Sequence, residues 1–331
     1  MTTIMRKEWL PTDMRKVLHV GPCNTPGGMA KVMEILSQNP PEGWQAEVLS
    51  SHSPKNFIQK LNAWLKARKW IKRNYKNYDL IHLHSAAGFS YRRKLNLARL
   101  SHKLGISVIF QIHSGQFDRF ASNNKQIKSQ LEPFTKVVLS DYWKETLEPI
   151  IGACQVLPNP VDEHIKFVPM ESKKQKQMLL LGRKDPVKGH AFAMELARTM
   201  RDEGWNLVAT GITHKEEGID GLGWVSEQEK RKLLEESAVL LVPSAFEGQP
   251  MAILEGLAAG CRVVTSENVT GFEKFVEKLP MVQQYWKDQL EQQSPKHPGN
   301  FESIKLHEIN SIHGKIIRLY SSCLIDFDQV D

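Results

Sequence analysis

Residues 240–267 read LLVPSAFEGQPMAILEGLAAGCRVVTSE, and this stretch decides the fold of the chain. An apolar run ends at Pro243, a helical pattern begins near Met251, and a second apolar run covers 262–265. Strand, helix and strand in this order form a βαβ unit, in which the two strands are parallel. Pro250 fits the first turn of a helix, because no backbone donor is lost there. The stretch therefore predicts part of a parallel α/β sheet.

Similar apolar runs recur along the chain, each bounded by Gly, Pro, Asp or Ser, and most are separated by segments long enough for a helix. Continuous apolar strands are typical of parallel sheets that helices cover on both faces. A polar stretch with three prolines, 157–177, interrupts the series. We therefore expect two Rossmann-like parallel-sheet domains, residues 1–160 and 161–331, which face each other across a cleft. The expected strands are 16–20, 80–84, 108–113, 137–140, 178–182, 207–211, 239–243 and 262–265.

The composition is that of a globular protein and excludes several classes. Of the 331 residues, 41% are hydrophobic and 24% are charged, which argues against a disordered or coiled-coil chain. The sequence contains no apolar run of about 18 residues, as a spanning helix needs, and no secretory signal at its start. The four cysteines lie far apart, outside any metal-binding spacing, so we expect buried thiols and a cytoplasmic location.

Two glutamates flank the start of the helical segment in the opening stretch. Glu247 precedes the helix and Glu255 lies one turn inside it, so both carboxylates can border one pocket. Glu255 lies in a mostly apolar helix, where a charge needs a specific partner. In the alternative interpretation, Glu247 is a helix-end charge and Glu255 faces solvent. Backbone N–H groups at 249–251 would present the positive end of the helix dipole to a phosphate.

Two other loops follow predicted strands and suit an anionic ligand. In 179-LLLGRKDPVKGHAFAMELA-197, Arg183 offers a fork and Lys188 a point charge to a diphosphate, although surface cations are also common in loops. In 17-VLHVGPCNTPGGMAKVMEIL-36, Gly27 and Gly28 permit a close backbone approach before a helix. This second signal is weak alone, because such glycines are about as often structural.

Together these residues resemble a known family. The spacing Glu247-(x7)-Glu255 is similar to the signature of retaining GT-B glycosyltransferases of the GT4-like type, also called glycosyl transferases group 1. GRKDPVKG (182–189) resembles the donor-diphosphate loop of that family, LPNPVD (157–162) its interdomain junction, and 211–244 its nucleotide-recognition stretch. The resemblance covers roughly residues 15–275 and implies the GT-B architecture. It also implies that a late helix, 302–320, packs back on the N-terminal domain.

The resemblance implies a role for each candidate site residue. Glu255 would bind the ribose hydroxyls, Glu247 would face the donor sugar, and His113 would lie near the reacting sugar, although a structural strand-end histidine is the alternative. His82 and His84 would be structural, or acceptor-side at most. The chain departs from the family pattern at Gln249, and the usual glycine-rich loop is reduced to Thr270-Gly271. The remaining implied contacts are Arg183, Lys188 and Gly28 to the diphosphate, Trp224 and Val225 to the base, and the backbone at Gly248, Gln249, Pro250 and Met251 to sugar or phosphate.

The implied reaction transfers a sugar from a nucleotide diphosphate sugar to a hydroxyl of a glycan or lipid-linked acceptor, with retention. No DxD motif accompanies these residues, so we expect no metal and no other cofactor, with Lys and Arg in place of a metal. A bacterial surface polysaccharide pathway is the expected context. The alternatives are a nucleotide-sugar hydrolase or epimerase of the same architecture and, ranked last, a nucleic-acid-binding protein.

Basic residues are concentrated in one region. Residues 55–104 contain 13 Lys and Arg but one acid, Asp79. Within it, 55–78 predicts an amphipathic helix, in which Trp70 lies near the polar side. Aromatic residues beside cations suit an anionic membrane surface, so we expect peripheral attachment to the inner face of the cell membrane and no nucleic acid partner. A core-facing helix with a solvated basic back is the alternative, and the oligomeric state stays open. The expected apolar face comprises Phe57, Leu61, Trp64, Leu65, Ile71 and Tyr75, and the basic face Lys55, Lys66, Lys69, Arg73 and Lys76.

Overall fold

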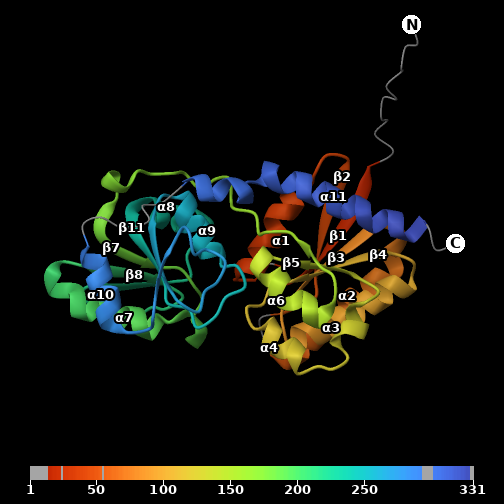
Figure 1. The fold of residues 1–331 in the computed structure, drawn as a ribbon, viewed down its shortest axis with the longest axis horizontal. Coiled ribbons are helices and arrows are strands. Elements are labelled where there is room, and N and C mark those ends of the chain that lie inside the picture. Colours follow the sequence, from red (N-terminus) through yellow and green to blue (C-terminus); the bar gives the residue numbers. More distant parts are fainter. Residues whose placement is uncertain (1–13, 24, 54–55, 293–300, 329–331) are drawn as a thin grey trace, which may run out of the picture.

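The computed structural model describes residues 14–23, 25–53, 56–292 and 301–328, which form two α/β units side by side (Figure 1). The first unit is built on a six-stranded sheet in which every neighbouring pair is parallel, in the order β2-β1-β3-β4-β5-β6. The central strands β3 and β4 are buried along their whole length, as expected of a parallel sheet covered on both faces, and β3 buries two histidines, His82 and His84. The strands are β1 (Arg15–Gly21), β2 (Trp44–Ser50), β3 (Leu80–Ser85), β4 (Ser107–Ile112), β5 (Thr135–Val138) and β6 (Gln155–Val156).

The second unit contains a seven-stranded sheet in the order β13-β12-β11-β7-β8-β10-β9. Its strands are parallel apart from the edge pair β9–β10, which is antiparallel. The prediction of two parallel-sheet domains is thus confirmed, whereas the exact division at residue 160 stays a prediction. The strands are β7 (Lys174–Leu180), β8 (Asn206–Thr210), β9 (Lys215–Glu216), β10 (Ile219–Gly223), β11 (Ser237–Val242), β12 (Arg262–Ser266) and β13 (Glu277–Leu279).

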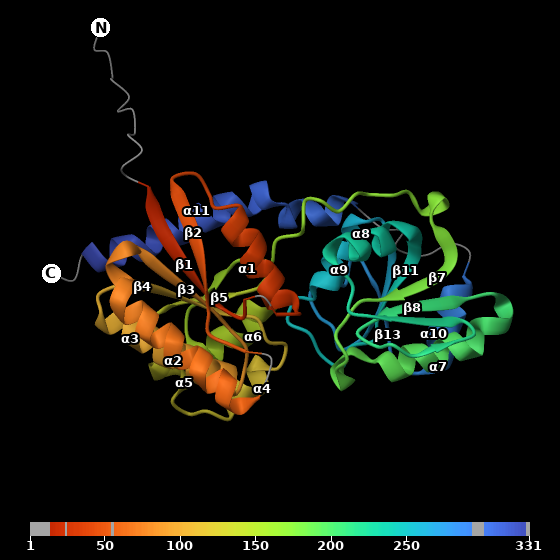
Figure 2. The same cartoon turned by 180° about the vertical axis from the view of Figure 1, so that it is seen from behind.

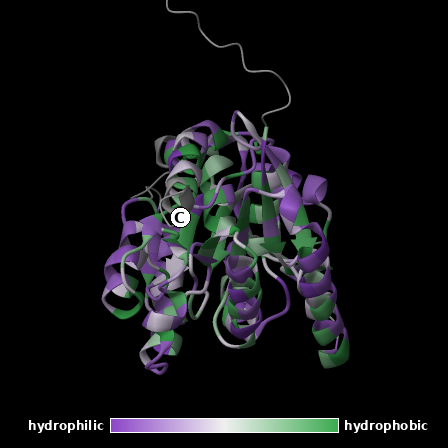
Figure 3. Cartoon of the chain, turned by 90° about the vertical axis from the view of Figure 1, so that its right-hand side faces the viewer, coloured by the Kyte–Doolittle hydropathy of each residue, from purple (hydrophilic) through white to green (hydrophobic). Residues whose placement is uncertain are grey.

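Helices cover both faces of each sheet (Figure 2). Apolar side chains fill the layers between helices and sheets, and Figure 3 shows hydrophobic residues along the strands. In the first unit, α2 (Phe57–Asn74), α3 (Phe89–Lys103), α4 (Phe117–Ser122), α5 (Ile127–Leu131) and α6 (Asp141–Ile151) pack on one face. Helix α1 (Gly28–Gln38) packs on the other. The second unit is covered by α7 (His190–Met200) and α10 (Gln283–Glu291) on one face, and by α8 (Glu227–Glu236) and α9 (Met251–Ala258) on the other.

The last helix, α11 (Ile309–Asp328), returns to the N-terminal sheet after the second unit is complete (Figure 1). The Ser107 hydroxyl at the start of β4 donates to the carbonyl of Cys323, 2.9 Å away. Tyr320 packs edge-on against Trp44, with 4.7 Å between ring centroids. The C-terminal segment therefore holds the two units together.

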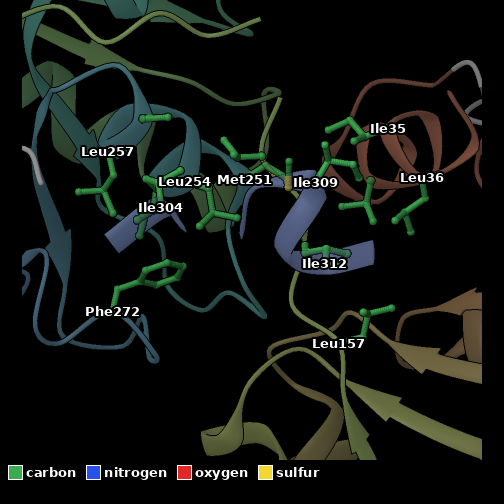
Figure 4. Packing of buried hydrophobic residues seen from close by; sticks show 14 of the residues in the cluster. Ile35, Leu36, Leu157, Met251, Leu254, Leu257, Phe272, Ile304, Ile309 and Ile312 are labelled. Carbon is green, nitrogen blue, oxygen red and sulfur yellow. The ribbon is translucent and has the colours of Figure 1, made fainter. Parts of the chain in front are cut away.

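One hydrophobic cluster also crosses between the two units (Figure 4). Ile35 of α1, Met251 and Leu254 of α9, and Ile312 of α11 all belong to it. The 3-10 helix Phe301–His307 adds Ile304, which is buried beside α9. This shared apolar packing restricts how far the units can separate.

Some expectations about local structure are wrong in detail. Trp70 does not lie on a solvated face: it is half-buried against the core and packs on Tyr78, with ring centroids 5.6 Å apart. Phe57 and Leu61 of the expected apolar face are exposed, which argues against the alternative of a core-facing helix at this end of the segment. Cys23 is half-buried rather than buried, whereas the other three cysteines are buried as expected. Lys55 lies outside the described residues, and no helix within the described ranges is long and apolar enough to cross a bilayer.

Candidate functional site

A cleft of about 440 Å³ opens between the carboxyl ends of the two sheets. In α/β folds this edge is where ligands bind, because loops and helix N-termini meet there. Both units contribute to its walls, and every site residue predicted from the sequence lines it. These residues are Gly28, His113, Arg183, Lys188, Trp224, Val225, Glu247, Gly248, Gln249, Pro250, Met251 and Glu255. Thr270 and Gly271 do not line this cleft.

Glu247 and Lys188 form an ion pair at the floor of the cleft. The Lys188 ammonium lies 2.5 Å from Glu247 Oε1, and the Ser244 hydroxyl donates to the same oxygen at 3.0 Å. Lys188 is placed by a 3-10 turn, Pro186–Lys188, whose N-cap Asp185 accepts from the backbone N–H of Val187. A phosphate entering here would share the Lys188 charge with Glu247.

Arg183 stands at the rim of the cleft and is 59% exposed. Its guanidinium is paired within its own loop, where it donates to Asp185 Oδ2 at 2.9 and 3.1 Å. Burial raises the pKa of Asp185, but the Arg183 hydrogen bonds and charge outweigh it and keep this pKa below its ordinary value. Arg183 also approaches the glycine loop of the first unit: a Cβ added at Gly27, whose φ is +140°, would lie 3.8 Å from Nη1.

Glu255 is buried on α9 and reaches a lysine on the neighbouring helix. Its Oε1 accepts from Lys230 of α8 at 2.7 Å. Burial raises the pKa of Glu255, and the Lys230 ammonium offsets this only in part. Lys230 also pairs with Glu227 at 2.9 Å. A carboxylate that is buried but faces a cleft suits a ligand that offers hydroxyl donors.

The ion-pair network continues across to the first unit through Lys31, a residue that itself carries no recognisable signal in the sequence. Lys31 of α1 lies 3.1 Å from Glu227 and 3.2 Å from Asp162 of the junction. Lys31 follows the Gly27-Gly28 loop, and Asp162 ends LPNPVD, so both lie in segments that the sequence had marked. Their pairing depends on the packing of the two units, for which no local pattern gives a signal.

The loop before α9 presents unused backbone donors to the cleft. Within the described residues, the backbone N–H groups of Glu247, Gly248, Gln249 and Met251 donate no hydrogen bond. They lie at the N-terminus of α9, where the helix dipole attracts anions. The side chain of Gln249, however, is already engaged, so only its backbone remains for a ligand.

Gln249 links the loop to the junction between the units. Its Oε1 accepts from the backbone N–H of Asn159 at 2.7 Å, and its Nε2 donates to the carbonyl of Leu139 at 3.1 Å. Asn159 Nδ2 in turn donates to the Gln249 carbonyl at 3.0 Å. The residue that departs from the family pattern is therefore a bridge between domains.

The loops after β4 and β11 touch through their backbones. A Cβ at Gly115 would lie 2.2 Å from the Glu247 carbonyl oxygen, and one at Gly248 would lie 2.2 Å from that of His113. Trp143 Nε1 donates to the Gly248 carbonyl at 2.6 Å. Both glycines are therefore required by a close approach of backbone to backbone.

His113 is connected to a chain of buried imidazoles. Its Nε2 lies 3.0 Å from His84 Nδ1, and His84 Nε2 lies 2.9 Å from His19 Nδ1. Burial lowers the pKa of His113 and of His19 to about 3, so both rings are neutral. His84 therefore acts on the cleft indirectly, because its hydrogen bond fixes the orientation of the His113 ring.

Two of these histidines, His19 and His84, also come close enough to His82 to suggest a metal ion. One ring nitrogen from each of His19, His82 and His84 lies within 4.8 Å of the others. The His82 and His84 rings are nearly parallel, however, at 19° and 4.4 Å, so their in-plane lone pairs do not converge. The positive charge of Lys94 also reaches His84. The geometry favours a hydrogen-bonded chain of neutral rings.

Comparison with known proteins identifies similar sequences and folds. Residues 175–284 match the family described as Glycosyl transferases group 1. An uncharacterized 41.2 kDa protein in the cps region of Klebsiella pneumoniae is 23% identical over 295 residues, which cover 76% of this chain and 80% of that protein.

Two solved structures have the same architecture. Sucrose-phosphate synthase from Thermosynechococcus elongatus superposes with a TM-score of 0.66 at 14% identity, covering 94% of this chain and all of that one. The lipopolysaccharide outer core galactosyltransferase WaaB gives a TM-score of 0.54 at 16% identity, covering 94% and 97% of the two chains. At such low identity these likenesses show the fold, which is GT-B.

Proposed function

We propose that this chain, a GT-B glycosyltransferase of the group 1 family, moves a sugar from a nucleotide diphosphate sugar to a hydroxyl of a glycan or lipid-linked acceptor, with retention of configuration. One observation carries the proposal. Glu247 and Glu255 line a single cleft together with Lys188 and Arg183. This arrangement offers carboxylates to hydroxyl groups and cations to a diphosphate.

The nucleotide would bind against the second unit. Glu255 would accept hydrogen bonds from the ribose hydroxyls, with Lys230 holding its charge. Trp224 is exposed at the rim of the cleft and would cover the base together with Val225. Gly28 would let the phosphates approach the first unit closely, because it has no side chain.

Bond cleavage requires stabilisation of the leaving nucleoside diphosphate. Lys188, Arg183 and the unused N–H groups before α9 would supply fixed positive charge. A preorganised donor of this kind is worth roughly 3 kcal/mol when water is excluded, and the exposed Arg183 would contribute less because solvent screens it. The Glu247–Lys188 ion pair favours Glu247 as a group that binds the sugar and orients Lys188. We therefore propose front-face transfer, in which the donor phosphate helps to deprotonate the acceptor, and His113 contacts the sugar as a neutral ring.

Metal-independent catalysis is part of the proposal. Each carboxylate that faces the donor diphosphate side already has a cationic partner: Glu247 pairs with Lys188 and Asp185 with Arg183. Turnover is expected to be unchanged by EDTA. A requirement for Mg²⁺ or Mn²⁺ would contradict this part.

The proposal is tested by incubating the full-length protein with a panel of nucleotide sugars, with and without glycan acceptors. Consumption of donor that depends on acceptor supports a transferase, whereas consumption of donor alone supports a hydrolase or epimerase. The anomeric proton of the product, followed by NMR, reports retention. Glu255→Gln keeps the shape of the side chain and should raise the donor Kd at least about tenfold. Donor binding equal to wild type would reject the assigned role of Glu255.

The biological setting is proposed from two observations. The relative from Klebsiella pneumoniae is encoded in a cps region, which favours surface polysaccharide synthesis. Helix α2 exposes Phe57 and Ile58, 71% and 65% accessible, beside the basic residues of its polar face. We therefore propose that the enzyme binds the anionic inner face of the cell membrane through α2, close to a lipid-linked acceptor.

A further inference from the structure

A buried ammonium group lies close enough to His113 of the cleft to act on its charge, and the donor chemistry does not use it. Lys94, in the second turn of α3, is 1% exposed. Lysine is almost never fully buried unless it is paired, because an unpaired charge loses its hydration. Within the described residues, the Lys94 ammonium makes no hydrogen bond and no ion pair.

The position of Lys94 is that of a ligand-binding group. Its charge acts on Cys23, His52, His84 and His113. These residues lie at or just beyond the carboxyl ends of β1, β2, β3 and β4, which are four neighbouring strands. The sheet reverses its strand order between β1 and β3, and ligands of α/β folds bind at such a switch point.

A second cation lies next to Lys94 in the same place. Arg93 Nη2 donates to His52 Nδ1 at 3.4 Å, and the buried Nε of Arg93 has no partner in the described part of the chain. Arg183 of the second unit acts on His52 from across the cleft. The one acid in residues 55–104, Asp79, precedes β3 at the opposite end of the sheet and accepts from the backbone of Lys16.

The two sides of the cleft therefore differ in charge balance. On the donor side, Lys188, Lys230 and Arg183 each have a carboxylate partner. No described carboxylate pairs with Lys94 or Arg93. A buried lysine and a half-buried arginine without carboxylate partners suit a dianion better than a single carboxylate, because each charge then finds a partner.

We propose that Lys94, Arg93 and His52 form an acceptor subsite for a phosphate or diphosphate group, so that the acceptor carries phosphate near the hydroxyl that is glycosylated. This inference rests on the proposed function, because it names the acceptor class of the same cleft. The phosphate could belong to a lipid diphosphate or to a soluble sugar phosphate, and the test separates the two sources.

The test is isothermal titration of the full chain in a Lys188→Ala background, since the donor pocket also suits diphosphates. Methylenediphosphonate serves as the probe without lipid, and geranyl diphosphate as the probe with an isoprenoid chain. Lys94→Met should weaken both at least about tenfold, and Arg93→Gln should also weaken them. Lys103→Met, at the exposed end of the same helix, is the matched control. Tighter binding of geranyl diphosphate would assign the phosphate to a lipid.

Three outcomes would overturn the proposal. The first is wild-type affinity for both probes in folded Lys94→Met and Arg93→Gln. The second is no binding of either probe when Lys188→Ala is the single change. The third is a methyl glucuronide that binds more tightly than both probes, which would assign the subsite to a carboxylate. None of these titrations contains a nucleotide sugar. The affinities for the probes can therefore be measured even if the protein proves not to transfer a sugar.

Discussion

Lys188 touches Glu247 at 2.5 Å and faces the place where the leaving group would develop charge. Lys188→Ala should lower kcat/KM about 100-fold or more, because it removes a fixed charge from the transition state. The fold should persist, since the side chain is partly exposed and lies in a loop. Turnover assays with circular dichroism check both expectations. Lys184→Ala, an exposed neighbour in the same loop, should act like wild type.

The burial of Lys94, a single residue, predicts how the stability of the protein depends on pH. Burial lowers its pKa to about 7, against about 10.4 in an unfolded chain. Below pH 7 both states hold the proton, and the buried charge destabilises the fold fully. Between about pH 7 and 10.4 the unfolded state binds more protons, so stability rises with pH. Lys94→Met should therefore raise Tm at pH 6.5 by on the order of 5 °C. The difference in Tm between the variant and the wild type should become smaller towards pH 10.

Thermal unfolding followed by circular dichroism from pH 6 to 10 measures this gap. Lys103→Met should shift Tm little at any pH, because Lys103 is exposed. A Lys94→Met variant that is less stable than wild type at pH 6.5 would show that Lys94 contributes favourably to folding.

How far single residues can be predicted depends on where their partners lie. Glu247, Glu255 and Lys188 follow strands in a recognisable order, so their meeting in one cleft could be expected from the sequence. Lys31 and Lys230 could not be assigned, because their partners come from the other unit or a neighbouring helix. Ion pairs between segments distant in sequence leave no local pattern.

At the scale of elements, helix α2 shows both the use and the limit of periodicity. The pattern predicted a helix over 55–78, and α2 covers Phe57–Asn74. Periodicity predicts which residues share the apolar face of a helix, but not which of them other elements bury. On this face Ile71 is buried, whereas Leu65 near the middle of the helix is exposed. Strand β2 was missed because it lies at the sheet edge and is mostly exposed, without a continuous apolar run.

The exposed apolar residues of α2 predict membrane binding. Replacing Phe57 and Ile58 by Ser should weaken binding to liposomes with anionic lipids, because the helix loses its inserted side chains. Charge reversal at Lys66, Lys69, Lys72 and Arg73 should release the protein more completely, since each cation near the surface contributes about 1 kcal/mol.

Cosedimentation with phosphatidylglycerol vesicles measures the bound fraction. Leu306→Ser serves as the control, because Leu306 is an apolar residue that is 64% exposed and lies outside α2. If all variants sediment with the vesicles as wild type does, α2 is not the membrane contact.

At the scale of the whole molecule, the two units are joined by more than the chain. A shared apolar cluster, the return of α11 and the Gln249 bridge all act between them. The sequence predicted two domains and a cleft because strand patterns are local. It could not predict this degree of contact, because packing between domains depends on complementary surfaces formed only after each sheet has folded.

Gln249→Leu tests the bridge. The variant loses the hydrogen bonds to Asn159 and Leu139, and it leaves their backbone groups without this partner inside the interface. The units should separate more often, so the radius of gyration from solution scattering should increase. The donor Kd should also rise, because Glu255 and Gly28, which come from different units, would contact the donor together less often. Gln228→Leu, an exposed change on α8, is the matched control. An unchanged scattering profile and donor Kd would mean that the apolar cluster and α11 suffice to set the cleft.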